Sequence, residues 1–354
     1  MSPALATVLL VLLAGIVFVL PLLPALIELR LKRDAYPLNV IQQYSGEIRH
    51  FSYGFRIYIE TLLEPLEKCV VSGTALKGAM PDGDEYLLLG NAGAALFSSA
   101  GKTIPNCSSI VATGVDMVLP DGVTFTKEVY AANKLMSGKK NVFRALLGER
   151  DIHLGRASTI NRWAHAVGAL RAGPDCELHG RISSDCEIQL DSGCEFQRLN
   201  APRIALGHLK AEAADAAPKT AEASLPVGRR LVEEDLEIKA GEVVTTNIVT
   251  RGRLHIRAGA RVLGSVKSNR HMTVDANVSV EGSLISASTM HIGRDCRISG
   301  PIIAEHGMAI DTGTRCGSPQ TPTTVTAPTI EIADGVVVFG TVWARTEGHV
   351  VPQR

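Results

Sequence analysis

Aliphatic side chains recur every 18 residues through the C-terminal third of the chain. Four units follow one another without a gap and begin at Leu236, Leu254, Met272 and Met290. Their third and ninth positions are uniformly aliphatic: Ile238, Ile256, Val274 and Ile292, then Val244, Val262, Val280 and Ile298. Alternating apolar positions indicate strands, and a unit of this length is too short for a strand plus a helix. The pattern therefore predicts an all-β fold, a parallel β-helix with 18-residue coils whose core ladder is formed by these side chains.

Glycine occupies the eleventh position in three of these units, as Gly264, Gly282 and Gly300. A glycine between two inward aliphatic positions is typical of a corner that a side chain would obstruct. We therefore interpret these residues as corner glycines of successive coils.

The same frame continues outside these units. It resumes at Met308 and again at Ile330, on either side of the Pro- and Thr-rich stretch 318–329. We predict a loop for that stretch, because proline cannot donate a ladder hydrogen bond. Upstream, the frame returns at Ile152, Leu170 and Ile188. A β-sandwich of short strands is the rival fold, but it would show irregular spacing.

The N-terminal segment is apolar and carries no charge before Glu28. Its run 4–27 is long enough to cross a hydrocarbon layer of ~30 Å at ~1.5 Å per residue. A cleaved signal peptide would need a basic start, which this chain lacks. Basic residues follow the run directly at Arg30, Lys32 and Arg33. The positive-inside rule then predicts a single-pass membrane protein whose C-terminal bulk is cytoplasmic.

A second amphipathic pattern follows the predicted transmembrane helix. Apolar residues recur at alternating spacings of three and four, at Ile41, Tyr44, Ile48, Phe51, Phe55, Tyr58 and Leu62. This periodicity predicts a juxtamembrane helix with one apolar stripe. The stripe is suited to three surfaces: the next domain of the same chain, the membrane surface, or a second copy.

These patterns divide the chain into five parts. We predict a transmembrane anchor over 1–29, a juxtamembrane amphipathic helical segment over 30–83, a first β-helix block with an N-terminal cap over 84–206, an Ala-rich linker or loop over 207–229, and a second β-helix block over 230–350.

The composition of the chain limits the classes of partner that we expect. The chain has 36 basic and 36 acidic residues, so its balance gives no reason to expect nucleic acid. Seven cysteines occur without a CxxC pair, which favours reduced thiols in the cytosol. Cys176, Cys194 and Cys296 share the seventh position of their units, where we expect small buried side chains rather than zinc ligands.

Candidate chemistry is sparse. His255 and His291 share an outward second position, so we expect surface residues there. The sequence contains no GxxxxGK[ST], GxSxG or HExxH motif. We therefore predict no catalytic, cofactor-binding or metal-binding residues and no enzymatic activity. The strongest enzymatic competitor is a hexapeptide-repeat acyltransferase, but the aliphatic-Gly step of such coils occurs here only sporadically, as at Leu154 and Ile292.

The segments VLGSV (262–266), VEGSL (280–284) and ISGPI (298–302) resemble the repeats of bactofilins, a family of bacterial polymer-forming cytoskeletal proteins. The resemblance is clearest over 236–310 and weaker over 152–206. It implies a right-handed β-helix that assembles end to end into filaments without nucleotide, often at the inner membrane.

The expected function is thus a membrane-anchored structural scaffold that self-associates through its β-helix and recruits cell-envelope machinery. Its expected partners are other copies of itself, membrane lipid through residues 4–27, and envelope-synthesis proteins, with no cofactor. One alternative is a membrane-tethered accessory protein or acyltransferase-like enzyme of envelope polysaccharide synthesis. Another is an adaptor that does not polymerise, favoured if both ends of the β-helix are capped.

Overall fold

The computed structural model describes residues 47–91, 98–99, 102–103, 106–208 and 228–352, with five single positions before residue 47. The chain divides into two compact units, Met1–Glu47 and Ile48–Arg354, and the second is described here by itself. Apart from those single positions, the predicted anchor 4–27 lies outside the described residues, as do Ile41 and Tyr44 of the predicted stripe. Among the described helices, none is both long and apolar enough to span a membrane.

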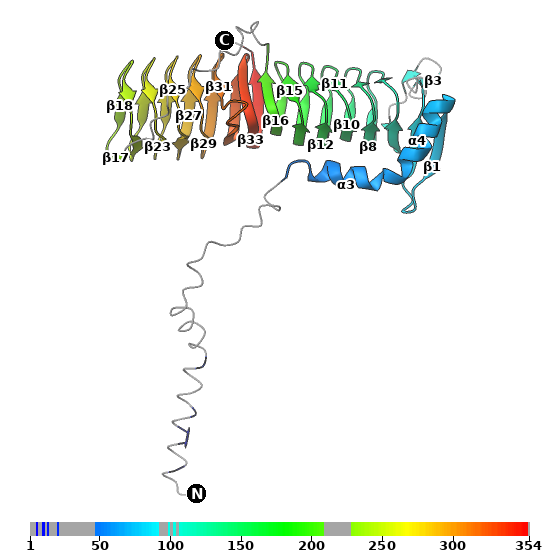
Figure 1. The fold of residues 1–354 in the computed structure, drawn as a ribbon, viewed down its shortest axis with the longest axis horizontal. Helices are drawn as coiled ribbons and strands as arrows, with labels where there is room; N and C mark the ends of the chain where they lie inside the picture. Colours follow the sequence, from blue (N-terminus) through cyan, green and yellow to red (C-terminus); the bar gives the residue numbers. More distant parts are fainter. Residues whose placement is uncertain are drawn as a thin grey trace. The chain divides into compact units, whose positions relative to one another are not determined.

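The second unit is a parallel β-solenoid of about 13 turns, so the predicted fold class is confirmed for this part of the chain. Two helices, α3 (His50–Tyr58) and α4 (Glu60–Ser72), precede the strands (Figure 1). The strands of the first block are β1 (Ala75–Ala79), β2 (Glu85–Leu89), β3 (Ser98–Ser99), β4 (Lys102–Thr103), β5 (Asn106–Cys107), β6 (Ile110–Thr113), β7 (Met117–Val118), β8 (Thr124–Ala131), β9 (Leu135–Met136), β10 (Val142–Gly148), β11 (Ile152–Leu154), β12 (Thr159–Ala166), β13 (Leu170–Ala172), β14 (Glu177–Ser184), β15 (Glu187–Leu190) and β16 (Glu195–Leu206).

The strands of the second block are β17 (Arg229–Val232), β18 (Leu236–Ile238), β19 (Val243–Val244), β20 (Asn247–Thr250), β21 (Leu254–Ile256), β22 (Arg261–Val262), β23 (Val266–Ser268), β24 (Met272–Val274), β25 (Ser279–Val280), β26 (Leu284–Ser286), β27 (Thr289–Ile292), β28 (Arg297–Ile298), β29 (Ile302–Ala304), β30 (Gly307–Ile310), β31 (Arg315–Cys316), β32 (Thr323–Ala333) and β33 (Val336–Val351). The coils that begin at Leu236, Leu254, Met272 and Met290 each contain three short strands.

Successive coils stack with the register that the repeat predicts. Leu254 pairs with Leu236 on one side and with Met272 on the other, and the same holds for the ninth and thirteenth positions of each unit. In a parallel ladder, in-register residues present their side chains to the same face. Each aliphatic column therefore becomes a continuous inward row.

A left-handed turn follows the first strand of each coil, at the sixth position of the repeat. Gly241, Gly259, Asn277, Asp295 and Gly313 all have φ between 56° and 76° there. Gly, Asn and Asp tolerate this conformation best. The first block uses the same position, with φ of 56° at Ala157 and 60° at Asp175. The sequence shows this column of turn residues, although the hydrophobic pattern alone does not single it out.

The predicted loop at 318–329 is only partly a loop. Strand β32 begins at Thr323 and runs through Pro328. Its register shifts between Ala327 and Thr329, so the proline lies at an irregularity of the ladder, where its missing N–H is tolerated. The predicted helical segment 30–83 is also interrupted, because β1 forms within it and pairs antiparallel with β2.

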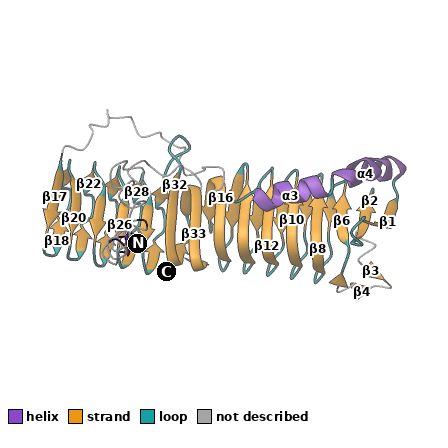
Figure 2. Cartoon of the chain, turned by 90° about the horizontal axis from the view of Figure 1, so that it is seen from below, coloured by secondary structure: helices purple, strands orange, loops and turns teal. Residues whose placement is uncertain are grey.

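The two blocks run in opposite directions and meet at their C-terminal coils. Strand β16 pairs antiparallel with β33, whereas β17 lies at the far end of the second block (Figures 1 and 2). The chain leaves β16 at Leu206 and re-enters the solenoid at Arg229. Residues 209–227, most of the predicted linker, lie outside the described residues. One hydrophobic core runs through both blocks, from Leu87 to Val350.

Candidate functional site

The predicted core ladder lies inside the solenoid. Its third-position residues are at most 2% exposed, and Val262, Val280 and Ile298 are equally buried. Val244, in the first coil of the block, is the exception, because it is only partly buried and packs against the core from its edge. These side chains hold the coils together, so whatever this protein binds must contact its ends or its sides.

The predicted corner glycines lie directly above one another. A Cβ added to Gly282 would come within 2.5 Å of the Gly264 backbone, and one added to Gly300 within 2.6 Å of the Gly282 backbone. Real Cβ atoms do not approach backbone so closely. Close stacking of the coils thus leaves no room for a side chain at Gly282 and Gly300.

The joint between β16 and β33 is apolar on its inner side. Val336, Val338 and Val342 of β33 are fully buried, as are Leu199, Ile204 and Leu206 of β16. Gly348 fits because it has no side chain: a Cβ there would lie 2.4 Å from the Phe196 ring. The two end coils therefore pack as closely as coils within one block.

Polar side chains close the outer side of this joint. The Ser192 hydroxyl donates to the Asp334 carboxylate at 2.7 Å, and Asn200 Nδ2 donates to Thr341 Oγ1 at 2.8 Å. The Arg198 guanidinium stacks on the Trp343 ring at 5.0 Å. Each pair joins a residue of the first block to a residue of the second, which ties the two blocks into one unit.

A mixed cluster of carboxylates and imidazole also crosses the joint. His349 Nε2 lies 3.3 Å from Glu347 and its Nδ1 lies 3.8 Å from Glu195. The ligand-type atoms of these three residues are all within 4.8 Å of one another. Nothing in the sequence singles them out, because Glu195 and His349 become neighbours only through the antiparallel joint. All three are accessible to water, and only the contact between Glu195 and His349 crosses the joint, because Glu347 lies on β33 together with His349.

The opposite end of the second block is an unpaired edge. Strands β17, β18 and β19 pair inward with β20, β21 and β22, and the described residues supply no strand on their other side. Unpaired N–H and C=O groups of such an edge can accept another strand. This end is therefore a candidate association surface.

The first block ends differently. There β1 adds an antiparallel strand to β2, and α4 packs on the outer side of β2 through Leu62 and Leu66. The fit is close, because a Cβ at Gly90 would lie 1.9 Å from the Cys69 carbonyl oxygen. Part of the predicted cap, including 92–97, lies outside the described residues.

Helices α3 and α4 lie against the side of the first block. Phe55 and Leu62 of the predicted stripe are buried, and Ile48 just before α3 is buried too. Phe55 contacts the Trp163 ring at a centroid distance of 5.8 Å. The stripe thus packs on the next domain of its own chain, one of the three surfaces considered above. Phe51 differs, since it stays 41% exposed.

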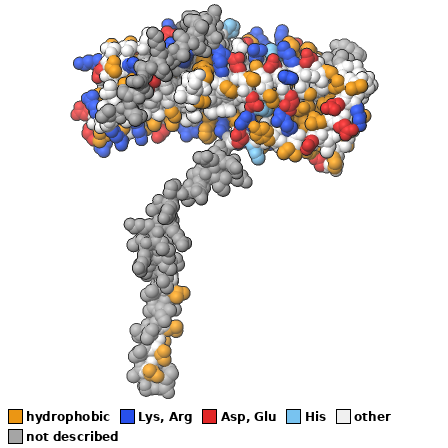
Figure 3. Space-filling model, viewed as in Figure 1, with side chains coloured by type: hydrophobic (Ala, Val, Ile, Leu, Met, Phe, Trp, Pro, Cys, Tyr) orange, Lys and Arg blue, Asp and Glu red, His pale blue; other side chains and the backbone are white. Residues whose placement is uncertain are grey.

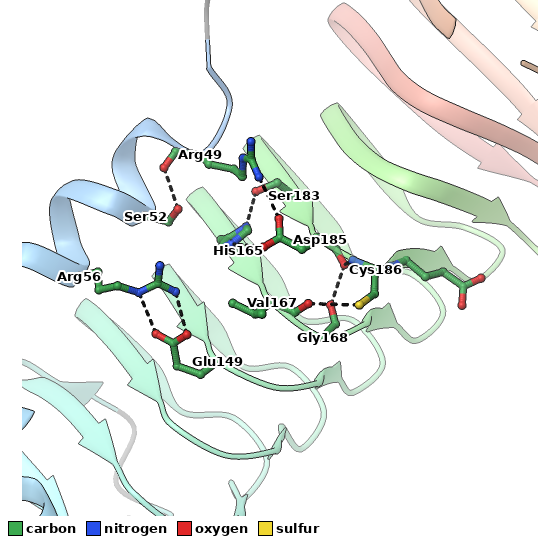
Figure 4. A network of polar contacts seen from close by, with 12 residues as sticks. Arg49, Ser52, Arg56, Glu149, His165, Val167, Gly168, Ser183, Asp185 and Cys186 are labelled. Carbon is green, nitrogen blue, oxygen red and sulfur yellow. Dashed lines mark hydrogen bonds and ion pairs between the residues drawn. The ribbon is translucent and has the colours of Figure 1, made fainter. Parts of the chain in front are cut away.

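Two arginines fasten α3 to the solenoid (Figure 4). Arg56 donates two hydrogen bonds to the Glu149 carboxylate, at 2.9 and 2.8 Å, and Arg49 just before the helix donates to Asp185 at 3.1 Å. Between these pairs His165 is 2% exposed, with Nδ1 2.9 Å from Ser183 Oγ. Burial lowers the pKa of His165, so its ring is neutral at pH 7.

The three thiols that share the seventh repeat position are buried, and the two imidazoles that share the second position are partly exposed. Cys176, Cys194 and Cys296 are fully buried, and burial raises the pKa of Cys296 to about 11. That thiol is therefore protonated and unreactive at neutral pH. His255 lies at the surface 2.7 Å from Asp275, and His291 lies 3.5 Å from Asp311.

The outer surface shows no large region of one charge on the face seen in Figure 3, where basic and acidic side chains are interspersed over the described parts of both blocks.

Comparisons with protein-family models, with curated proteins and with solved structures found no match for this chain.

Proposed function

We propose that this protein is a structural scaffold: a stiff solenoid tethered to the inner membrane by residues 4–27, along whose sides cell-envelope proteins are held. The observation that carries the proposal is the single hydrophobic core that runs through both blocks and their joint. Because each coil is buried by its neighbours, such a core makes the solenoid resist bending as one body. The proposal keeps the scaffold expected from the resemblance to bactofilins, but with a length set within one chain.

Two features support a fixed length. The C-terminal ends of both blocks are already used in the joint between β16 and β33. At the N-terminal end of the first block, the antiparallel strand β1 interrupts the parallel stacking. Growth by repeated end-to-end stacking needs two matching free ends per copy.

Negative-stain electron microscopy of the full chain in mild detergent, without nucleotide and over a concentration series, tests the scaffold. We expect separate rods of one length at every concentration. Filaments that lengthen with concentration would instead support the polymer-forming protein that the resemblance implies, and would overturn the fixed length. Compact trimers would support the acyltransferase alternative and overturn the scaffold.

The tether has its own test. In cells, the full chain is expected in the membrane fraction after carbonate washing, and a variant lacking residues 4–27 in the soluble fraction. Equal distribution of the two proteins would refute the tether while leaving the rod intact.

A second candidate is the filament-forming scaffold itself. The specific observation in its favour is that end coils of this chain do pair, as β16 and β33 show. It requires the edge at β17 to pair with another copy, so it depends on whether the side chains at that edge allow pairing.

A further inference from the structure

One inward column changes character at the open end of the second block. Strand β17 pairs in register with β20, so Arg230 faces the same way as the buried Ile248. The column continues through the block with buried aliphatic residues: Val266, Leu284, Ile302, Val325 and Val342. A guanidinium thus occupies the terminal position of a row that is otherwise aliphatic.

A second inward column changes in the same way. Glu242 directly precedes β19, at the position that Ala260 holds before β22. Ala260 and the residues that follow it in this column are at most 1% exposed: Val278, Cys296, Thr314 and Val336. Glu242 itself is exposed. The open end therefore has a cation and an anion where the interior has small or aliphatic side chains.

The Glu242 carboxylate also replaces part of a missing coil. Inside the block, the Arg257 N–H donates to the carbonyl of Ile238 in the preceding coil. The equivalent Lys239 N–H has no preceding coil and donates instead to Glu242 Oε2 at 2.8 Å. This end is thus built as a terminus, with an edge donor satisfied by a side chain of its own coil.

The joined end shows what pairing requires. In the same two columns the last coil has Val336 and Val342, both fully buried against the first block. The C-terminal coils of a second copy are already joined to each other, so it would present its own edge of β17, β18 and β19 here, and Arg230 would be buried between that edge and the aliphatic column that begins at Ile248. Inward-pointing charges on an edge oppose pairing because such burial costs several kcal/mol.

We propose that the edge of β17, β18 and β19 is a self-association surface for a second copy of this chain, and that Arg230 and Glu242 keep it closed. The backbone of this end is competent to pair, and two side chains prevent it. Their removal opens the surface.

The test is the double variant Arg230→Ile, Glu242→Val, which installs the residues found at Ile248 and Val278 in the same columns. The full chain in density-matched detergent is examined by sedimentation equilibrium. Wild type is expected to be monomeric, and the variant to associate with a Kd roughly 100-fold lower or more, because each added tenfold needs only about 1.4 kcal/mol. A variant as monomeric as wild type, with the circular dichroism and melting of the folded protein, would overturn the proposal, as would a wild type that pairs through this end as tightly as the variant.

Two controls make the result specific to the end. Lys267→Ile with Glu281→Val makes the same kind of change at exposed positions within the block, and should leave the mass at that of wild type. Adding Val232→Lys to the associating variant places a new charge in the terminal strand and should restore the monomer. Association of the first control, or failure of the second to restore the monomer, would place the contact elsewhere and refute the proposal.

Discussion

The second block begins with the short strands β17, β18 and β19 and finishes with the 16-residue strand β33, and its two ends differ in what they pair with. One is joined to the first block through an antiparallel pair, and the other is a free edge. The inner side of the joined coil is valine at two columns where the free coil has Arg230 and Glu242. The hydrogen-bonding capacity of the edge is therefore available at both ends, and inward side chains decide which edge is used.

The largest expected effect on stability comes from exchanging the arginine and the valine that the two ends have in the same column. Val342→Arg places a charge at the buried joint, and we expect a loss of roughly 3–5 kcal/mol of unfolding free energy. The reverse change, Arg230→Val, removes an exposed charge and should alter stability by less than about 0.5 kcal/mol. Urea unfolding of both variants measures the difference. Equal losses would contradict the distinction between the ends.

A smaller effect is expected from Gly348→Ala. The new methyl group would lie 2.4 Å from the buried Phe196 ring, which would have to shift, so we expect a loss of about 1–3 kcal/mol. The matched control is Gly54→Ala in α3, where nothing lies within 4 Å of the added Cβ. That change should gain about 0.5–1 kcal/mol through helix propensity. Thermal melting of both variants checks the opposite signs.

Deleting one polar contact at each end of the second block should again lower stability more at the joint than at the free edge. Ser192→Ala leaves the Asp334 carboxylate without its hydroxyl donor at the joint, and we expect a loss of about 1.5–3 kcal/mol. Glu242→Ala removes the acceptor of the Lys239 N–H at the free edge, where water can take its place, so we expect less than about 1 kcal/mol. Hydrogen exchange should show faster exchange of the β33 amides in the first variant only.

The smallest expected effect is a pH dependence of stability that arises from His165, which lies on the side of the solenoid away from both ends. Burial first, and then the charges of Arg56 and Arg49, lower the pKa of His165, while Asp185 and Glu149 act in the opposite direction. Below about pH 6.5 the unfolded chain binds a proton that the folded chain does not, so stability falls as pH decreases toward the lowered pKa. His165→Gln should reduce this slope, measured by urea unfolding between pH 7 and pH 5. An unchanged slope would assign the pH dependence to other groups.

The columns of the solenoid could be predicted because each coil repeats the same contacts. A ladder residue such as Val274 meets its equivalents Ile256 and Ile292 above and below, so local periodicity reports a tertiary contact. The prediction of a loop at Pro328 was wrong, because strand β32 continues through it. A register irregularity at this point means that the ladder does not need a donor N–H from the proline. The sequence predicted the stripe of α3 but left its partner open, since the apolar stripe alone does not distinguish a membrane from Trp163.

The sequence by itself determined the coil: its length, its inward columns and its corner glycines follow from spacing along the chain. Only the tertiary structure decided that the two blocks meet at their C-terminal coils, because the contact between Glu195 and His349 or between Phe196 and Gly348 leaves no periodic trace. The same joint shows why Arg230 and Glu242 are unusual, because the joined end has valines in the same two columns. In the sequence they are ordinary charges, and they become notable only when one end of the block is seen joined and the other free.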